Sequence, residues 1–179
     1  MIEMRFVFPC KEYEIKAIEF IQEFHDHQSE INGTGGLDGH LVEGSYSGWL
    51  DKIMKDLDIA NIPEGRVPSY TYFYVRPHDD KIIGMINIRL ALNDFLRNEG
   101  GHIGYSIRPM ERGKGYGTRM LREALSFCRI IGLCDIIVTC DKDNIASSTV
   151  VKNCGGVLVH EFYSDVYKTD VQRYTISLR

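Results

Sequence analysis

The feature that most constrains this chain is a run of alternating glycines, Gly113, Gly115 and Gly117, within the sequence RGKGYG at 112–117. An apolar alternating stretch, residues 101–108, precedes the run, and a stretch with helical periodicity follows it. The unpaired N–H groups at the start of a helix, together with its dipole, favour an anion, and glycine lets the backbone approach that anion closely. The pattern therefore predicts a strand, a phosphate-binding turn and a helix.

The segments around this turn predict a mixed α/β fold in a single domain, residues 1–179. Helices are expected over residues 11–28, from 47 to before Pro63, and over 117–131 and 146–153, and strands over 5–8, 69–76, 81–92, 101–108, 136–140, 157–163 and 171–178. The strand before the turn, the helix after it and the strand at 136–140 form a βαβ unit with parallel strands. Residues 32–48 are expected to be a loop, either functional or a flexible connector, and residues 93–99 a polar connection.

Composition narrows the class of protein. The chain has 179 residues, 44% of them apolar, which is enough for a core without disulfides. Its five cysteines include no C-x-x-C pair, so we expect free thiols, no metal site and a cytoplasmic location. A net charge of −4 argues against a nucleic-acid partner, and no apolar run approaches the roughly 18 residues that span a membrane.

Two common phosphate-binding motifs fail on this sequence. A Walker loop needs Lys and then Ser or Thr after its last glycine, whereas Gly117 is followed by Thr118 and Arg119. A dinucleotide fingerprint, G-x-G-x-x-G, needs a third glycine where this chain has Thr118 in one register and Met120 in the other. Both nucleotide classes are therefore disfavoured.

The remaining pattern, R-x-x-G-x-G at residues 112–117, resembles the acyl-CoA-binding motif of the GNAT superfamily of N-acetyltransferases. The match extends to the strand before it, the helix after it, and an N-x-x-S…G-G pattern from Asn144 to Gly156, so that it covers residues 70–160. The stretch INIRLALNDFLRNEGGHIGYSIRP further resembles a bacterial branch of predicted acetyltransferases. A turn without a ligand would need one glycine rather than three.

This resemblance implies a central, mostly antiparallel mixed sheet flanked by helices, in which the strand before the turn splays from its partner. It also implies acetyl-CoA as the acyl donor and CoA as the product, with no metal. The residues that it assigns to the cofactor are Ile107, Arg112, Gly113, Lys114, Gly115, Tyr116, Gly117, Thr118, Asn144 and Ser147. Among these, Ile107 and its neighbours would supply a backbone donor to the thioester oxygen, and Asn144 would bond the pantetheine arm.

The catalytic groups are less defined. An amine with a pKa of about 10.4 must lose a proton before it attacks, and Glu99 is our first candidate for the base, with His102 second. Many family members protonate the leaving thiolate with a tyrosine at the position of Val151, so here Tyr105 could act instead, or the thiolate leaves unassisted. Each candidate has a structural alternative: a solvated Glu99, a hydrogen-bonded His102 and a core Tyr105. Alternation along one strand would place His102 opposite Tyr105.

The sequence thus predicts an acetyl-CoA-dependent N-acetyltransferase that acts on a primary amine, most simply of a small molecule, by direct attack. The alternatives are a non-catalytic acyl-CoA-binding regulatory module and an acetyltransferase for protein N-termini or lysines. No membrane partner is expected, and a homodimer is compatible with the sequence. Asp141, at the end of the strand 136–140, is expected to cap the helix that follows.

Overall fold

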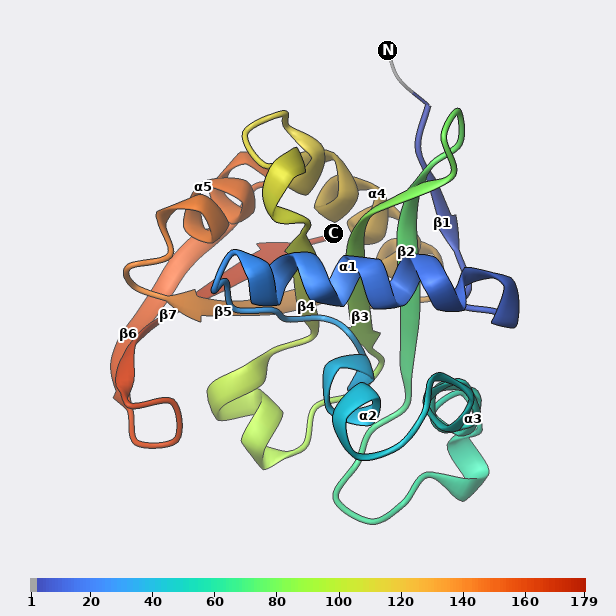
Figure 1. Ribbon diagram of the computed structural model, residues 1–179. Helices are drawn as coiled ribbons and strands as arrows, with labels where there is room; N and C mark the ends of the chain where they lie inside the picture. Colours follow the sequence, from blue (N-terminus) through green and yellow to red (C-terminus); the bar gives the residue numbers. More distant parts are fainter. Residues whose placement is uncertain (1–2) are drawn as a thin grey trace. The chain divides into compact units, whose positions relative to one another are not determined.

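The computed structural model describes residues 3–179, and its contacts divide them into two compact units (Figure 1). The first unit comprises the described residues up to Ala91 and residues Gly104–Tyr116, and the second comprises Leu92–Ile103 and Gly117–Arg179. The expected single domain stays a prediction, and each unit has its own sheet.

The first unit contains a four-stranded sheet in the order β1-β2-β3-β4. Its strands are β1 (Arg5–Val7), β2 (Ser69–Arg76), β3 (Lys81–Arg89) and β4 (Ile103–Ile107), the first residue of β4 being counted with the second unit. β2 is antiparallel to both β1 and β3, and a bulge interrupts its register with β3 between Tyr74 and Val75. The tyrosines and β-branched residues that alternate along β2 favour this pleated, paired conformation.

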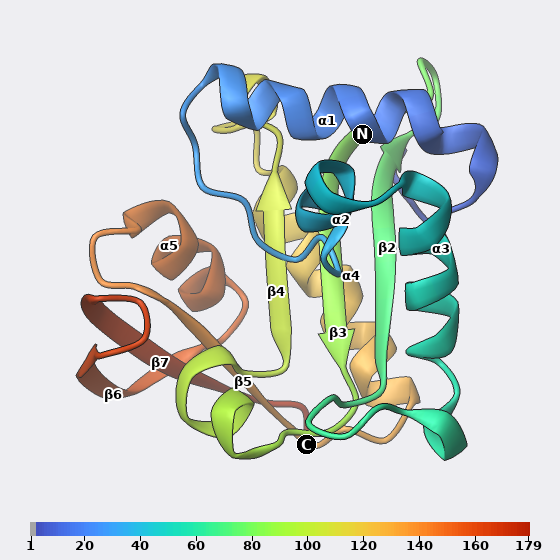
Figure 2. The same cartoon turned by 60° about the horizontal axis from the view of Figure 1, so that its bottom comes forward.

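Helices cover one face of this sheet. They are α1 (Glu14–Asp26), α2 (Leu37–Glu43) and α3 (Tyr46–Lys55), with short 3₁₀ turns η1 (Lys11–Tyr13), η2 (Ile59–Asn61) and η4 (Pro109–Glu111). The three α-helices bury their apolar sides against β2 and β3 (Figure 2). Trp49 and Phe20 are fully buried in this core, packed with Phe73 and Met85 of the strands.

The expectation of a continuous loop over residues 32–48 is wrong, because α2 and the start of α3 lie within it. Leu37 is fully buried, and this anchors the short helix in the core. The indole N–H of Trp49 donates to the carbonyls of Thr34 and Gly35, both at 3.2 Å, and the Lys52 ammonium also donates to Gly35. These tertiary contacts outweigh the low helix propensity of a glycine-rich stretch.

The second unit contains a three-stranded sheet in the order β5-β7-β6. Its elements are the π-helical turn η3 (Leu96–Gly100), α4 (Tyr116–Ile130), β5 (Asp135–Asp141), α5 (Ile145–Asn153), β6 (Val157–Ser164) and β7 (Thr169–Ser177). The predicted antiparallel pair of β6 and β7 is confirmed. β5 forms its ladder with β7, antiparallel, and β4 belongs to the other sheet.

Helix α4 shows the predicted amphipathic stripe. Its buried residues are Met120, Leu121, Ala124, Leu125 and Cys128. Ile131, the last residue of the helix expected over 117–131, lies one residue beyond the end of α4 and is 38% exposed. Along the chain, β4, the glycine turn, α4 and β5 follow one another in the predicted order.

Three further features concern the part of the chain that the structure describes. All five cysteines are free thiols. In residues 3–179, no group of three His, Cys, Asp or Glu side chains is placed to hold a metal ion. None of the described helices combines the length and the apolar character needed to cross a membrane.

Candidate functional site

The glycine turn has the backbone geometry of an anion-binding loop. Gly113 and Gly115 have φ angles of +75° and +79°, in the left-handed region that favours glycine. A Cβ atom at either position would meet no atom within 4 Å, so this side of the turn is open. Within the described residues, the N–H groups of Gly113, Lys114 and Gly115 have no backbone acceptor. Consecutive free N–H groups ahead of a helix form a concave nest for an anion, so the turn fits a phosphate group.

The Arg112 side chain folds away from this nest. Its Nε donates to the carbonyl of Ile107 at 3.0 Å and its Nη2 to the Ser29 hydroxyl at 2.8 Å. The guanidinium also lies over the ring of Phe24, 5.4 Å from its centroid. The Arg112 side chain thereby fastens the turn to β4 and α1, its backbone N–H donates to the carbonyl of Pro109, and its cofactor role stays a prediction.

Strand β4 is covered on one face by the segment that precedes α2. The Ser106 hydroxyl accepts from the backbone N–H of Asn32 at 2.6 Å and donates to the carbonyl of the same residue at 2.7 Å. Gly33 lies so close that a Cβ atom there would be 2.2 Å from the carbonyl oxygen of Gly104. Because side chains alternate along a strand, half-buried Tyr105 extends from the opposite face of β4.

The predicted polar connection before β4 is a π-helical turn, η3, which holds Glu99. Gly101 ends this turn with φ +69° and ψ −172°, a conformation almost restricted to glycine, and a Cβ atom there would be 2.5 Å from the Ile137 carbonyl oxygen. The backbone carbonyl of Glu99 accepts a hydrogen bond from the Thr139 hydroxyl at 2.9 Å. Its carboxylate oxygen Oε2 is buried, and within the described residues it has no hydrogen-bond partner.

His102 lies between this turn and β4 and bonds to β5. Its backbone N–H donates to the carbonyl of Ile137 at 2.7 Å, and its Nδ1 accepts from the N–H of Ile137 at 2.9 Å. That bond requires the tautomer without a proton on Nδ1. The expected alternation of His102 and Tyr105 along one strand is wrong, because β4 begins only at Ile103.

Asn144 caps helix α5, in place of the expected Asp141. Its Oδ1 accepts from the backbone N–H of Ser147 at 3.0 Å, whereas Asp141 is the last residue of β5. The cap occupies Oδ1 and leaves the amide Nδ2 outside this bond. Val151, at the position where many family members carry a tyrosine, is fully buried in α5 and contributes no polar group.

The predicted site residues are divided between the two units. The first unit holds Tyr105, Ile107 and residues 112–116, and the second holds Glu99, His102, Gly117, Thr118, Asn144 and Ser147. Within the second unit, Glu99 and His102 are both bonded to β5, at Thr139 and Ile137. Sequence reasoning missed Glu111, a buried acid just before the turn. Its spacing of three residues from Lys114 was the available signal.

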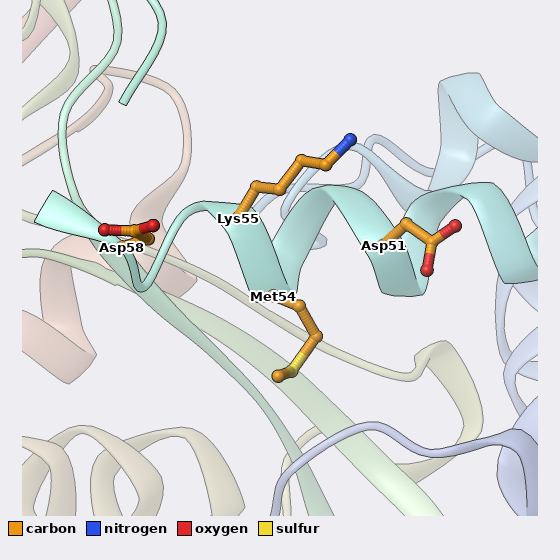
Figure 3. A pocket seen from close by; sticks show the side chains of 4 residues that line it. All are labelled: Asp51, Met54, Lys55 and Asp58. Atoms are coloured by element: carbon orange, nitrogen blue, oxygen red, sulfur yellow. The ribbon is translucent and has the colours of Figure 1, made fainter. Parts of the chain in front are cut away.

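A separate pocket lies on α3, open to solvent and lined by Asp51, Met54, Lys55 and Asp58 (Figure 3). None of the predicted site residues lines it. Asp58 uses one carboxylate oxygen to accept from the backbone N–H of Ala60 at 3.1 Å, as a cap of η2. We assign no function to this pocket.

Comparison with protein families decides the identity of the fold. The family model described as "Acetyltransferase (GNAT) domain" matches residues 37–157, more than half of the 179-residue chain. The chain belongs to the GNAT acetyltransferase family. By sequence, no curated protein matches this acetyltransferase.

Solved structures of low sequence identity share the GNAT fold. The microcin C7 self-immunity acetyltransferase MccE, in complex with acetyl-CoA and AMP, has a TM-score of 0.73 at 15% identity, covering 98% of this chain and 93% of its own. RimL, the ribosomal L7/L12 alpha-N-protein acetyltransferase in complex with coenzyme A, has a TM-score of 0.71 at 14% identity over 99% and 96%. A chimera of the spermidine N-acetyltransferase SpeG from Vibrio cholerae has a TM-score of 0.64 at 14% identity over 97% and 94%.

These findings establish the general activity. The protein is an acetyltransferase, and the acyl donor bound in MccE, which shares its fold, is acetyl-CoA. The glycine turn, with its open Cβ side and its free N–H groups, fits the phosphate groups of that donor.

Proposed function

We propose that this acetyltransferase moves the acetyl group to a primary amine of a small molecule, which attacks the thioester directly while Glu99 accepts its proton. The observation that carries the proposal is the Oε2 atom of Glu99, which is buried and lacks a hydrogen-bond partner among the described residues. A buried oxygen of this kind costs free energy unless a ligand or a water satisfies it. An ammonium group of the acceptor would do so.

Acetyl-CoA supplies an activated acyl group, and the residues of the chain must manage the protons. An alkylamine with a pKa of about 10.4 is almost wholly protonated at neutral pH, so a base has to remove one proton before the nitrogen can attack. The Thr139 hydroxyl fixes the backbone at Glu99 and thereby holds its carboxylate in place. His102 is the second candidate, but its Nδ1 already accepts from the N–H of Ile137.

The state of the cysteines supports direct attack over an acetyl-cysteine route. Burial raises the thiol pKa of four cysteines, to about 11 for Cys128 and in the same direction for Cys10, Cys140 and Cys154. A thiol with a raised pKa is protonated at neutral pH and is a poor nucleophile. The amine itself is then the better nucleophile.

The leaving thiolate takes its proton from Tyr105 or from water in this proposal. Val151 provides no hydroxyl at its position in α5, whereas half-buried Tyr105 extends from the face of β4 opposite Ser106. A thiol with a pKa of about 8.5 is a tolerable leaving group without an acid, so Tyr105 should assist only modestly. The backbone N–H of Ile107, in the same strand, is our candidate donor to the thioester oxygen.

The test is a turnover screen with acetyl-CoA, monitored by release of free thiol, against polyamines, amino acids, aminoglycosides and peptides. Peptides belong in the panel because RimL acts on a protein N-terminus, which keeps acetylation of protein N-termini or lysines as the second candidate. With the best acceptor, Glu99→Gln should lower kcat by about a hundredfold, the usual contribution of a general base. Its affinity for CoA should not change.

Asp94→Asn is the matched control, because it changes an exposed acid to its amide five residues away in the same connecting segment. It should leave kcat unchanged. If Glu99→Gln kept the wild-type rate and pH profile, Glu99 would not be the base. If no amine released thiol above the hydrolysis background, the proposed acceptor class would be wrong.

A further inference from the structure

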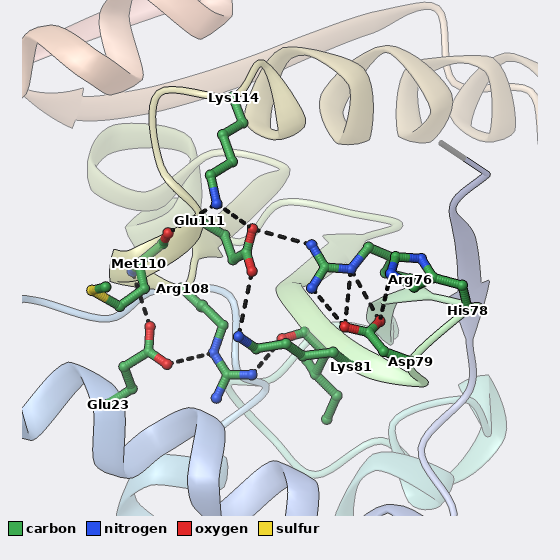
Figure 4. A network of polar contacts seen from close by, with 10 residues as sticks. Glu23, Arg76, His78, Asp79, Lys81, Arg108, Met110, Glu111 and Lys114 are labelled. Carbon is green, nitrogen blue, oxygen red and sulfur yellow. Dashed lines mark hydrogen bonds and ion pairs between the residues drawn. The ribbon is translucent and has the colours of Figure 1, made fainter. Parts of the chain in front are cut away.

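Glu111 forms the centre of a cluster of charges beside the glycine turn (Figure 4). It is only 5% exposed, and three cations contact its carboxylate. Its Oε2 accepts from Lys114 at 2.8 Å and from Arg76 at 3.2 Å, and its Oε1 accepts from Lys81 at 3.3 Å. One buried carboxylate therefore joins the turn to the hairpin of β2 and β3, because Arg76 ends β2 and Lys81 begins β3.

Both side chains inside the turn lead into this cluster. Lys114 donates to Glu111 and also to the carbonyl of Met110 at 3.2 Å, which curls its side chain back over η4. Tyr116 is largely buried, and after Asp79 it is among the groups that raise the pKa of the Arg76 guanidinium. Asp79 holds the other side of the Arg76 guanidinium through bonds of 2.6 to 3.2 Å.

In this arrangement the side chains anchor the turn, and the backbone N–H groups are available to bind an anion. The Lys114 side chain is held by Glu111, while among the described residues the N–H groups of Gly113 and Gly115 have no backbone acceptor. Glycine loses more conformational entropy on ordering than any other residue, so a turn containing several glycines is costly to fix. Side-chain contacts that fix the turn before the ligand arrives reduce the conformational entropy that is lost on binding.

Glu111 keeps its charge at every working pH. Burial by itself raises the pKa of its carboxyl, but hydrogen bonds from Lys114, Arg76 and Lys81 outweigh burial and bring the pKa to about 2. The carboxylate neutralises much of the Lys114 charge at 2.8 Å. Lys114 is therefore engaged as an anchor rather than displayed as a free cation for phosphate.

We propose that Glu111 is a positioning residue for acetyl-CoA, which holds Lys114 and Arg76 so that the glycine turn keeps its phosphate-binding backbone conformation. The inference rests on the role proposed above for the turn. It differs from the alternative in which Lys114 leaves Glu111 and pairs with the phosphates of the donor. In that alternative Glu111 competes with the ligand, and its removal would tighten binding.

A double-mutant cycle distinguishes the two, with CoA affinity measured by calorimetry at two salt concentrations. We expect Glu111→Gln to weaken CoA binding about tenfold, the order expected for loss of charge-assisted anchors. Lys114→Met should weaken it by about threefold in the wild-type background and by nothing further in Glu111→Gln, because both act through the same contact. The slope of affinity against salt should stay the same in Lys114→Met.

The matched control is Asp80→Asn, which removes a second acid of the same hairpin. Asp80 accepts from Tyr13 at 2.6 Å, from Arg5 at 3.3 Å and from Lys16, none of which belongs to the turn. It should leave CoA affinity unchanged. Thermal unfolding of each variant identifies any loss of fold, and the Lys114→Met salt slope decides the question alone if Glu111→Gln does not fold, since the Lys114 side chain is 53% exposed.

Three results would overturn the inference: unchanged or tighter binding by Glu111→Gln, a larger effect of Lys114→Met in that background than in the wild type, or a reduced salt slope in Lys114→Met. Each would mean that Lys114 reaches the phosphates itself or that the cluster is irrelevant to binding. If the wild-type protein bound CoA but Gly115→Asp bound it equally well, the role of the turn would fail instead. The two failures are therefore distinct.

Discussion

The glycine turn and the Glu99 segment differ in which of their polar groups, backbone or side-chain, are hydrogen-bonded within the protein. In the turn, the side chains of Arg112 and Lys114 have partners, Tyr116 is largely buried, and among the described residues backbone N–H groups are left for a ligand. In the Glu99 segment the backbone is bonded, to Thr139, and a side-chain oxygen is left without a partner. Binding by backbone needs a fixed conformation, whereas proton transfer needs a chemically specific side chain.

The largest effect should come from placing a negative charge in the turn. Gly115→Asp has room for its side chain, but its carboxylate would face the phosphates of the donor. Repulsion between unit charges about 4 Å apart near a protein surface is about 4 kcal/mol, or about a thousandfold in affinity. Calorimetry with CoA measures this loss, and the melting temperature shows whether the fold survives.

Gly132→Asp is the control for that substitution, because Gly132 also has a positive φ, +87°, and open space at its Cβ position. It carries the same backbone strain away from the turn. Equal loss of CoA affinity in both variants would show that strain, and not charge, is responsible. Wild-type affinity in Gly115→Asp would remove the turn from the binding site.

The next effect tests the Glu99 segment through its backbone. Gly101→Ala forces a Cβ atom to within 2.5 Å of the Ile137 carbonyl in a conformation that only glycine adopts readily, which should cost about 3 kcal/mol of unfolding free energy. We expect kcat to fall while CoA affinity is kept. Gly155→Ala, at φ +87° without a clash, should cost about 1 kcal/mol. Equal costs in denaturant titrations would contradict the strain at Gly101.

Unfolding at low pH should reveal the contribution of Glu111 to the stability of the first unit. Its folded pKa of about 2 lies below the ordinary value of 4.5, so its contribution is complete above about pH 5 and is lost as the pH falls towards 2. A shift of this size corresponds to about 3 kcal/mol. Between pH 5 and pH 2 the wild type should therefore lose more stability than Glu111→Gln, as measured by urea titration at each pH. If the unfolding free energies of the two proteins fell in parallel with pH, the Glu111 cluster would not stabilise the fold as inferred.

Asp79 is coupled to this measurement through Arg76. Hydrogen bonds from Arg76 lower the pKa of its carboxyl to about 2 as well. Because Glu111 and Asp79 both accept from Arg76, replacing Glu111 also changes the surroundings of Asp79, and the difference between the two proteins measures the cluster as a whole.

The smallest effect should come from Tyr105→Phe. If Tyr105 gives a proton to the leaving thiolate, kcat should fall by about fivefold, since a thiol with a pKa of about 8.5 needs little assistance. The fall should be the same for every acceptor in the panel, because the leaving group does not change. An unchanged kcat would assign that proton to water.

The contrast between the two regions explains what the sequence could predict. Three glycines at every second position indicate a backbone conformation that other residues rarely adopt. The turn, and the strand and helix around it, were therefore predictable from the local sequence pattern. Helix α4 and the β6–β7 hairpin follow for the same reason, because their periodicities are local. The short helix α2 was not predictable in this way. It depends on the burial of Leu37 in the core and on the bonds from Trp49 to Thr34 and Gly35, which are tertiary contacts.

The catalytic candidates show the same limit. The π-helical turn depends on Gly101 approaching Ile137, and the position of His102 depends on the same residue of β5. Neither contact has a signature within residues 93–102. Alternation therefore gave the wrong relation between His102 and Tyr105, and the pairing of β5 with β7 was missed because it joins residues 30 to 42 positions apart.

The position of β7 has a consequence for how the second unit is made. β7 comes last of the strands in chain order but lies in the middle of its sheet, and among the described strands β5 has no ladder partner except β7. During translation, β5 and the adjoining Asn144 must therefore wait, exposed, until residues 169–177 have left the ribosome. Until then a nascent chain can contain the complete glycine turn without a finished second sheet, and apolar Ile136 and Val138 are the surfaces that a chaperone would meet.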